Sequence, residues 1–147
     1  MVELTPRSRE QRKADVLHRL ERDVDCWVAT AGAGPHLVPL SLDWVDERVV
    51  LATGAGTVTA RNLLAGGRAR LALGATRDVV SVEAELERHL PAEEAGEALL
   101  DRYARRTGWR PGAGDLVLWL RPLRVRAWRE VDEISGRTLM RDGRWLV

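Results

Sequence analysis

Residues 26–53, CWVATAGAGPHLVPLSLDWVDERVVLAT, decide the fold. Apolar residues recur at every second position in three consecutive runs of this stretch: Cys26–Ala31, His36–Trp44 and Val49–Thr53. A period of two is expected of β-strands with one buried face. Glycines and a proline at 32–35 and an acidic pair at 46–47 separate the runs, and these residue types favour turns. We therefore predict three short antiparallel strands.

The second of these runs has a proline in its middle and two faces of different character. Val38, Leu40, Leu42 and Trp44 share one face, whereas Pro39, Ser41 and Asp43 share the other. We expect the first face in the core and the second to be available to a ligand. Pro39 cannot donate to a β-ladder, so at that point the strand must be an edge, a bulge or the opening of a sheet. An opening is a place where a planar ligand can lie.

Three helices are predicted around the strands. The first starts at the capping box Ser8-Arg9-Glu10-Gln11 and covers one end of a barrel, with an apolar stripe of Ala14, Leu17, Leu20 and Val24. The second spans Thr57 to Leu64, between a capping threonine and the stop signal Gly66-Gly67. The third begins at Pro91 and ends near Gly108.

The rest of the chain supplies further strands. We predict a hairpin of Arg70–Thr76 with Val79–Arg88, a long strand over Leu116–Trp128, and a final hairpin over Arg137–Val147 that turns at Asp142-Gly143. In the long strand, the apolar residues change from one set of alternate positions to the other at Arg121-Pro122. Such a change indicates a bulge or bend. Glu83, Glu85 and Glu87 share one face of their strand, so that face must meet solvent or an interface.

These elements predict a mainly β fold, namely a closed or split β-barrel of six to seven antiparallel strands with about three helices. The 147 residues, of which 45% are hydrophobic, are enough for one sizeable core. We expect a single domain over residues 1–147, with a helix within 1–24 and a terminal hairpin over 137–147.

Composition excludes several classes of partner. The chain has 23 basic and 22 acidic residues and a formal charge of +1, so no strong field attracts nucleic acid or an anionic membrane. Its one cysteine, Cys26, cannot form an internal disulfide, fits a reducing compartment, and is most simply a small buried apolar residue. The first 23 residues lack the apolar core of a signal peptide, and no run approaches a membrane span. We expect a cytoplasmic protein.

Most catalytic signatures are missing. Gly-Ala-Gly occurs at Gly32, Gly54 and Gly112, but no copy has the third glycine of a dinucleotide-binding fold. The chain has no phosphate-binding loop that ends in lysine, no nucleophile elbow and no helical zinc motif. The histidines, at 18, 36 and 89, do not have metal-ligand spacing, so no metal site is predicted.

Residues 53–63, TGAGTVTARNL, contain the most informative motif. A glycine-rich strand exit lets the backbone approach a ligand, and the helix that starts at Thr57 offers free amide groups to an anion. Arg61 can add a bidentate contact to a phosphate. The alternative interpretation is a plain helix cap with a solvated arginine.

The order of the motifs resembles a known superfamily. The resemblance rests on Trp27–Thr30, Pro35–Ser41, Leu51–Thr53, Thr57–Leu63 and Arg70–Leu73, and it extends from about Asp25 to the carboxyl terminus. These motifs are similar to the pyridoxamine 5'-phosphate oxidase-like, flavin-binding split barrels, and within them to the flavin/deazaflavin oxidoreductases. Gly108-Trp109 and 136–145, GRTLMRDGRW, resemble a subgroup signature.

The resemblance implies a homodimer in which each flavin or deazaflavin lies in a groove at the subunit interface. The cofactor would be a deazaflavin coenzyme (F-420) or FMN, with haem as a third candidate, and its phosphate would bind the segment from strand three to the helix. Many relatives carry lysine or arginine near the start of that segment. Here Gly54–Thr59 contains neither, which leaves Arg61 as the basic candidate.

The predicted cofactor-binding residues come from four parts of the chain. They are His36, Val38, Pro39 and Ser41 in the second strand, Thr53, Thr57, Thr59, Arg61 and Asn62 around the glycine-rich turn, Trp109, and Arg137, Arg141 and Trp145 in the terminal hairpin. Trp109 and Trp145 are candidates to cover a planar ligand, whereas Trp44, Trp119 and Trp128 are expected in the core. The hairpin is expected to reach across the dimer, although it can also be a solvated edge that discourages aggregation.

Family members reduce small conjugated substrates with hydride from the bound cofactor, so no catalytic side chain is predicted. The resulting hypothesis is a dimeric reductase that acts on a small-molecule substrate. The alternative is a split barrel that holds flavin or haem without turnover.

Overall fold

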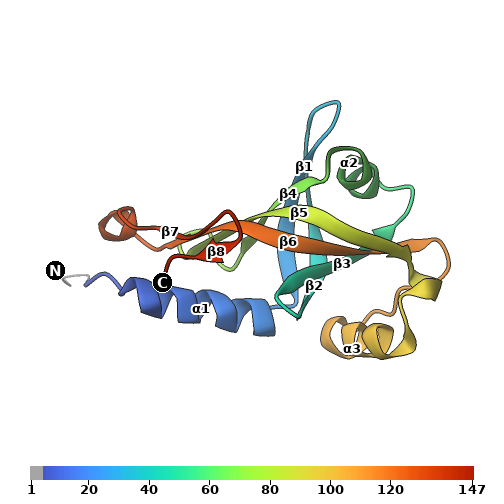
Figure 1. Ribbon diagram of the computed structural model, residues 1–147, viewed down its shortest axis with the longest axis horizontal. Coiled ribbons are helices and arrows are strands. Elements are labelled where there is room, and N and C mark those ends of the chain that lie inside the picture. Colours follow the sequence, from blue (N-terminus) through green and yellow to red (C-terminus); the bar gives the residue numbers. More distant parts are fainter. Residues whose placement is uncertain (1–4) are drawn as a thin grey trace.

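The computed structural model describes residues 5–147. Its strands are β1 (Asp25–Ala31), β2 (Pro35–Val45), β3 (Arg48–Gly54), β4 (Arg68–Leu73), β5 (Val79–Pro91), β6 (Asp115–Trp128), β7 (Thr138–Arg141) and β8 (Arg144–Trp145). Its helices are α1 (Arg9–Arg22), α2 (Val58–Gly66) and α3 (Glu97–Thr107), with 3-10 turns η1 (Ala92–Glu94) and η2 (Val131–Glu133). Figure 1 shows α1 and α3 below the strands, α2 above their right-hand part, and the β7–β8 hairpin at the left.

Six of the strands close into an antiparallel barrel. The sheet order is β3-β2-β1-β4-β5-β6-β7-β8, and β3 also pairs with β6, which joins the ends of the six-stranded part. In this closure Val49 to Gly54 pair with Leu120 to Asp115. The predicted mainly β barrel is therefore confirmed, with β7 and β8 added beyond it.

The barrel opens beside Pro39. Strand β2 pairs with β1 over Pro35–Ser41 but with β3 only over Leu42–Val45. Pro39 lies opposite Trp27 of β1, and its other edge has no strand beside it in this pairing. Of the three predicted alternatives, an edge, a bulge or an opening, the structure shows a strand edge at Pro39, where a residue without an amide proton needs no ladder partner.

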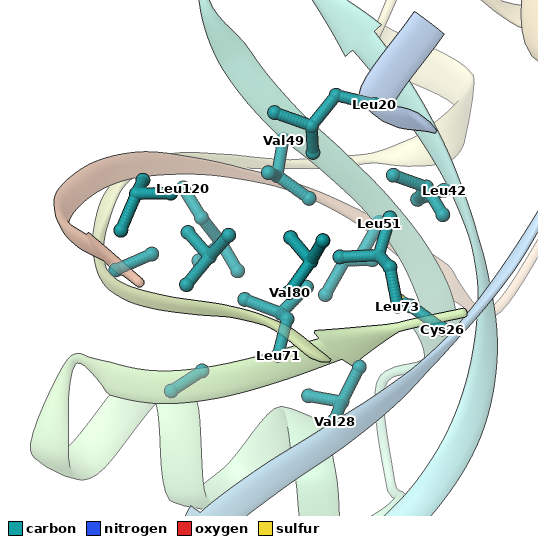
Figure 2. Close-up of a cluster of buried hydrophobic side chains, with 14 of the residues drawn as sticks. Leu20, Cys26, Val28, Leu42, Val49, Leu51, Leu71, Leu73, Val80 and Leu120 are labelled. Atoms are coloured by element: carbon teal, nitrogen blue, oxygen red, sulfur yellow. The ribbon is translucent and has the colours of Figure 1, made fainter. Parts of the chain in front are cut away.

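The barrel interior is a continuous apolar cluster. Strands β1–β7 contribute its walls, α1 adds Val16 and Leu20, and α2 adds Leu63. Figure 2 shows Val28, Leu51 and Leu71 from three different strands among these side chains. Cys26 belongs to the same cluster and is 3% exposed, as expected of a small apolar residue. Burial raises the pKa of its thiol to about 12.

A second cluster lies where α3 covers the outside of β3 and β6. This contact overturns the expectation that Asp43 belongs to an available face, because Asp43 is only 1% exposed. Its carboxylate accepts hydrogen bonds from Arg102 Nε at 2.9 Å and from a terminal nitrogen of Arg106 at 3.0 Å, both on α3. Burial of the charge is thus compensated by two guanidinium groups.

The Ser8 cap of α1 was predicted correctly, but the buried face of this helix was predicted correctly only at Leu20. Ser8 Oγ accepts a hydrogen bond from the Gln11 amide at 3.1 Å. The buried side chains are Arg12, Val16 and Leu20, whereas Ala14 is exposed and Leu17 and Val24 are half-buried. Arg12 can be buried because its guanidinium donates to the carbonyls of Ala127 and Glu133, at 3.2 and 3.0 Å.

The third helix starts later than predicted. Strand β5 continues to Pro91, the turn η1 follows, and Gly96 with φ of +93° precedes α3. Gly108, with φ of +79°, ends the helix at the predicted place. Helix α2 agrees with prediction at both ends, from its cap Thr57 to Gly67, where φ is +70°.

The irregularity of β6 and the terminal turn were also predicted correctly. The pairing with β5 moves from Glu83–Arg124 to Ala84–Pro122, so Leu123 is an extra residue next to Pro122. Asp142 and Gly143 have φ of +52° and +76°, as a tight turn between β7 and β8 requires. The acidic face of β5 is matched by arginines, among them Arg70 with Glu83 and Arg121 with Glu85.

Glu133 connects η2 to the segment that precedes α1. Its side chain is 3% exposed and accepts hydrogen bonds from the Arg7 amide, from Arg7 Nε and from the Arg129 amide, at 2.9, 3.0 and 2.8 Å. The hydrogen bond from the Arg7 guanidinium lowers the pKa of Glu133 to about 2, against the opposing effect of burial. The folded protein therefore holds this carboxylate ionised well below its ordinary range.

We predict that this carboxylate makes the fold sensitive to acid. Because the folded pKa of about 2 is below the ordinary 4.5, the stabilisation is complete above pH 4.5 and is lost as pH falls towards 2. The contribution of the ionised Glu133 carboxylate to the free energy of unfolding is about 3 kcal/mol. Urea unfolding across this pH range should show a much flatter acid dependence for Glu133→Gln than for the parent. Glu94→Gln, an exposed change, is the control, and equal slopes for all three proteins would contradict the assignment.

Candidate functional site

The glycine-rich turn between β3 and α2 is held by two threonine hydroxyls. Thr57 Oγ accepts a hydrogen bond from the Ala60 amide at 3.2 Å and donates to the Gly54 carbonyl at 2.9 Å. Thr53 Oγ lies 3.3 Å from Thr57 Oγ, at the end of β3. The Thr57 side chain is already used within the turn, so a ligand here would meet backbone amides rather than this hydroxyl.

The start of α2 has the properties of an anion site. The first amides of a helix lack intrahelical partners and attract negative charge, and Gly54 and Gly56 leave room for close approach. Arg61 is exposed and forms no ion pair within residues 5–147. Thr59 is buried, with 2% exposure, so its part in ligand binding would be limited to its backbone.

A pocket of about 370 Å³ lies between α2 and the loop that joins β1 to β2. His36, Arg61 and Asn62 line it together with Val58 and residues 33–35. In Figure 1 the β1–β2 loop rises beside α2. The structure thus brings three of the predicted residues from two separate segments into one place.

Asn62 ties α2 to the β1–β2 hairpin. Its Nδ2 donates to Thr30 Oγ at 3.1 Å, and Thr30 is 6% exposed. A Cβ atom on Gly32 would lie only 2.3 Å from Asn62 Oδ1, so the close approach depends on glycine at this position. Sequence reasoning missed Thr30 and Gly32, although a polar residue at an inward position of a strand is a usable signal.

The other predicted residues of β2, namely Val38, Pro39 and Ser41, lie along the barrel opening and do not line this pocket. Val38 is half-buried and Pro39 is exposed. Ser41 Oγ donates to Asp25 Oδ1 at 3.0 Å, and its carbonyl accepts from the Tyr103 hydroxyl at 2.9 Å. Burial raises the pKa of Tyr103, so this hydroxyl keeps its proton.

Trp109 lies on the loop after α3, 44% exposed and edge-on to Tyr103 with 6.3 Å between ring centroids. The same loop reaches the glycine-rich turn, because the Ala55 amide donates to the Gly114 carbonyl at 2.9 Å. Trp109 is therefore on a segment that borders the candidate anion site.

The terminal hairpin lies far from α2 in the same chain. Gly54, next to α2, pairs with Asp115 at one end of β6, whereas Thr138 pairs with Arg126 near the other end. At about 3.3 Å per residue, these two points of β6 are roughly 35 Å apart. Arg137 and Arg141 are consequently not brought to the α2 pocket of their own chain.

The tryptophans are distributed differently from expectation. Trp145 was expected to be hard to bury, but it packs against the barrel cluster and Lys13 Nζ lies 4.9 Å from its ring centroid. Pairing of β8 with β7 places it there, opposite Met140. Trp44 and Trp119 are half-buried against the two clusters, and Trp128 is half-buried beneath the guanidinium of Arg137.

Two large apolar side chains that sequence reasoning did not single out are exposed on the outside of β1 and β2. Trp27 is 50% exposed and Leu37 is 61% exposed. Trp27 pairs with Pro39 and Ala29 pairs with Leu37, so these residues form a continuous apolar surface beside the barrel opening. The period of two already places Trp27 opposite to the buried Cys26 and Val28.

A sequence profile for pyridoxamine 5'-phosphate oxidase matches residues 14–129. The chain belongs to this family. The pyridoxamine 5'-phosphate oxidase match covers the six barrel strands, α2 and α3, but it ends before η2 and the terminal hairpin. Arg137, Arg141 and Trp145 thus lie outside the part that defines the family.

Solved structures with the same fold include an F420 reductase, with 17% identity over 74% of this chain and 93% of that chain and a TM-score of 0.63. A FAD-binding protein from Mesorhizobium loti has 18% identity over 82% and 94%, with a TM-score of 0.55. A conserved hypothetical protein from Mycobacterium tuberculosis has 22% identity over 82% and 86%, with a TM-score of 0.60. A search of the curated proteins finds no match.

Two further observations concern the part of the chain that the structure describes. None of its helices is both long and apolar enough to span a bilayer. Within residues 5–147, no three His, Cys, Asp or Glu side chains gather where they could hold a metal ion.

We predict that the contact between Asn62 and Thr30 stabilises the α2 pocket. A double-mutant cycle of Asn62→Ala and Thr30→Val, followed by chemical unfolding, should give a coupling free energy of about 1 kcal/mol, the usual net value of one hydrogen bond. Leu64→Ala, on the exposed side of α2, serves as a control for helix changes. Strictly additive effects of the two substitutions would show that the contact contributes nothing.

Proposed function

We propose that the chain is a flavin- or deazaflavin-dependent oxidoreductase that transfers hydride from the reduced cofactor to a small conjugated substrate. The observation that carries this proposal is the glycine-rich start of α2, with the unpaired Arg61 beside it, in a barrel of the pyridoxamine 5'-phosphate oxidase family. The F420 reductase and the FAD-binding protein with the same fold support the same class of cofactor.

The residues present fit the phosphate of such a cofactor. The α2 amides and the Arg61 guanidinium offer positive charge on one side of the pocket, and no acidic residue lines it. Gly54–Thr59 contains no basic side chain, so Arg61 would supply the full charge of this part of the site. His36 and Asn62 would add polar contacts from the same pocket, whereas Val38 and Pro39 offer an apolar surface to a planar ring.

The bound cofactor would supply the hydride chemistry, and the chain would bind and orient it. The apolar opening along β2 would exclude water from one face of the ring, and Trp109 would cover another part of the site. We assign no catalytic side chain, because neither the turn nor the pocket contains a nucleophile paired with a base.

Titration of the purified protein with FMN, FAD, haem and the deazaflavin coenzyme tests this proposal. A flavin-type cofactor should bind most tightly, and once reduced on the protein it should be reoxidised by a quinone or enone faster than in buffer. Tight binding without faster reoxidation would favour a non-catalytic flavin carrier. Preferential binding of haem would favour a haem-binding barrel.

Arg61→Ala should weaken cofactor binding by about 1.5–3 kcal/mol, the value of a hydrogen bond to a charged group, without loss of the fold. Arg105→Ala is a matched control, because Arg105 is also an exposed helical arginine without an ion pair among residues 5–147. Fluorescence or calorimetric titration gives both affinities. If Arg61→Ala binds every candidate cofactor as well as the parent, the phosphate assignment is wrong.

We also propose that the chain forms a homodimer through the apolar surface of Trp27, Leu37 and Pro39, with each cofactor in the groove between subunits. Exposure of 50% and 61% at Trp27 and Leu37 is a large apolar area for a free surface. In such a dimer the terminal hairpin of one subunit would lie at the cofactor site of the other. Arg137, Arg141 and Trp145 would then contribute to the partner's cofactor site rather than to their own.

Leu37→Glu should convert the dimer into a monomer and weaken cofactor binding, because a carboxylate would be buried without a partner in the interface. Val131→Glu is the control, since Val131 is 85% exposed but lies on η2, away from this surface. Sedimentation velocity at micromolar concentration distinguishes the two states. If the parent protein is a stable monomer under these conditions, both the proposed dimer and the proposed interfacial site are wrong.

A further inference from the structure

A second pocket, of about 420 Å³, lies where the start of α1 meets β6 and the terminal hairpin. Four arginines line it, namely Arg9, Arg126, Arg137 and Arg141, and we call it the arginine pocket. Ile134 and Leu146, which are 39% and 43% exposed, add apolar surface. No carboxylate is among its lining residues.

The charge of the arginine pocket is not neutralised by the protein. None of its four arginines forms an ion pair with any carboxylate of residues 5–147. On the same strand as Arg126, by contrast, Arg124 is paired with Glu83 at 3.8 Å and Arg121 with Glu85 at 2.7 Å. The pocket thus brings four unpaired guanidinium groups together in a chain whose formal charge is only +1.

Two of these side chains are held in place by contacts that leave their charge available. Arg9 donates from Nε to the Gly136 carbonyl at 3.2 Å and from a terminal nitrogen to the Thr138 carbonyl at 2.7 Å. Arg137 stacks over Trp128, with 5.3 Å between its guanidinium carbon and the ring centroid. Because these contacts already hold the two side chains in place, less conformational entropy is lost when an anion binds.

Arg126 lines the pocket from β6 and forms no ion pair among residues 5–147. Its Nε is fully buried and has no hydrogen-bond partner in the described chain. The same holds for the Nε atoms of Arg12 and Arg106, which do not line the pocket, so this buried atom is not itself evidence of a ligand. An oxyanion in the pocket would compensate the charge of the Arg126 guanidinium.

We propose that the arginine pocket binds a small organic anion with two negative charges and an apolar group. The oxygens of the anion would accept hydrogen bonds from Arg126 and its neighbours, and the apolar group would lie against Ile134 and Leu146. A phosphate monoester and a dicarboxylate share this chemistry. The site goes beyond the proposed cofactor site, because Arg9 and Arg126 have no part in that site and the pocket is lined by a single chain.

Isothermal titration at constant ionic strength tests the proposal with phenyl phosphate, inorganic phosphate and phenylsuccinate as probes. Phenyl phosphate should bind at least tenfold more tightly than inorganic phosphate, because only the former contacts the two apolar side chains. If phenylsuccinate binds more tightly than phenyl phosphate, the natural ligand is a dicarboxylate, and the opposite order indicates a phosphate monoester.

Arg126→Gln and Arg141→Gln should each weaken phenyl phosphate binding at least tenfold. Arg141 is exposed, so its substitution keeps the test valid even if Arg126→Gln unfolds the chain. Arg144→Gln is the matched control, since Arg144 is an exposed arginine of the same hairpin that does not line the pocket. Unchanged affinity in both pocket variants would overturn the proposal.

The same titrations separate this site from the cofactor site. FMN binding should be unaffected by Arg126→Gln, and the pocket's affinity for phenyl phosphate should be unaffected by Arg61→Ala. Failure of flavin binding in the parent would overturn the proposed function but leave the arginine pocket intact. Parallel loss of FMN and phenyl phosphate binding in folded Arg126→Gln would overturn the separate site and assign the arginine pocket to the cofactor.

Discussion

The pairing of β3 with β6 is the contact on which the rest of the structure depends. It joins two segments more than sixty residues apart in sequence and closes the six-stranded barrel. Without it, β3 would be an edge strand and the glycine-rich turn would have no fixed position. Because β6 also pairs with β5 along most of its length and with β7 near its end, one strand sets the positions of the α2 pocket and the arginine pocket.

Charge is distributed unevenly in a chain whose total is almost balanced. On the outside of β5 each glutamate has an arginine partner, so this face has little net field. Arg61 and the four arginines of the arginine pocket have no such partner within residues 5–147. At these two pockets an external anion would supply the negative charge that no carboxylate provides, and the formal charge of +1 for the whole chain gives no sign of either.

Features that depend on near neighbours in sequence were predicted well. The strands of residues 26–53, the Ser8 and Thr57 caps, the bulge next to Pro122 and the Asp142-Gly143 turn all follow from local periodicity or local backbone preference. Features that depend on a distant contact were predicted poorly. Asp43 seemed available because nothing in its own strand shows that α3 supplies two guanidinium groups to it.

The sequence by itself determined the fold class, the barrel opening at Pro39 and the glycine-rich turn before α2, because alternation and the loss of an amide proton act locally. Only the tertiary structure decided that Asn62 meets Thr30, that Trp145 covers its own barrel and that Arg126 keeps an unpaired donor in a cationic pocket. Periodicity shows which face of an element is apolar, but the partner of that face is chosen by packing between segments far apart in sequence.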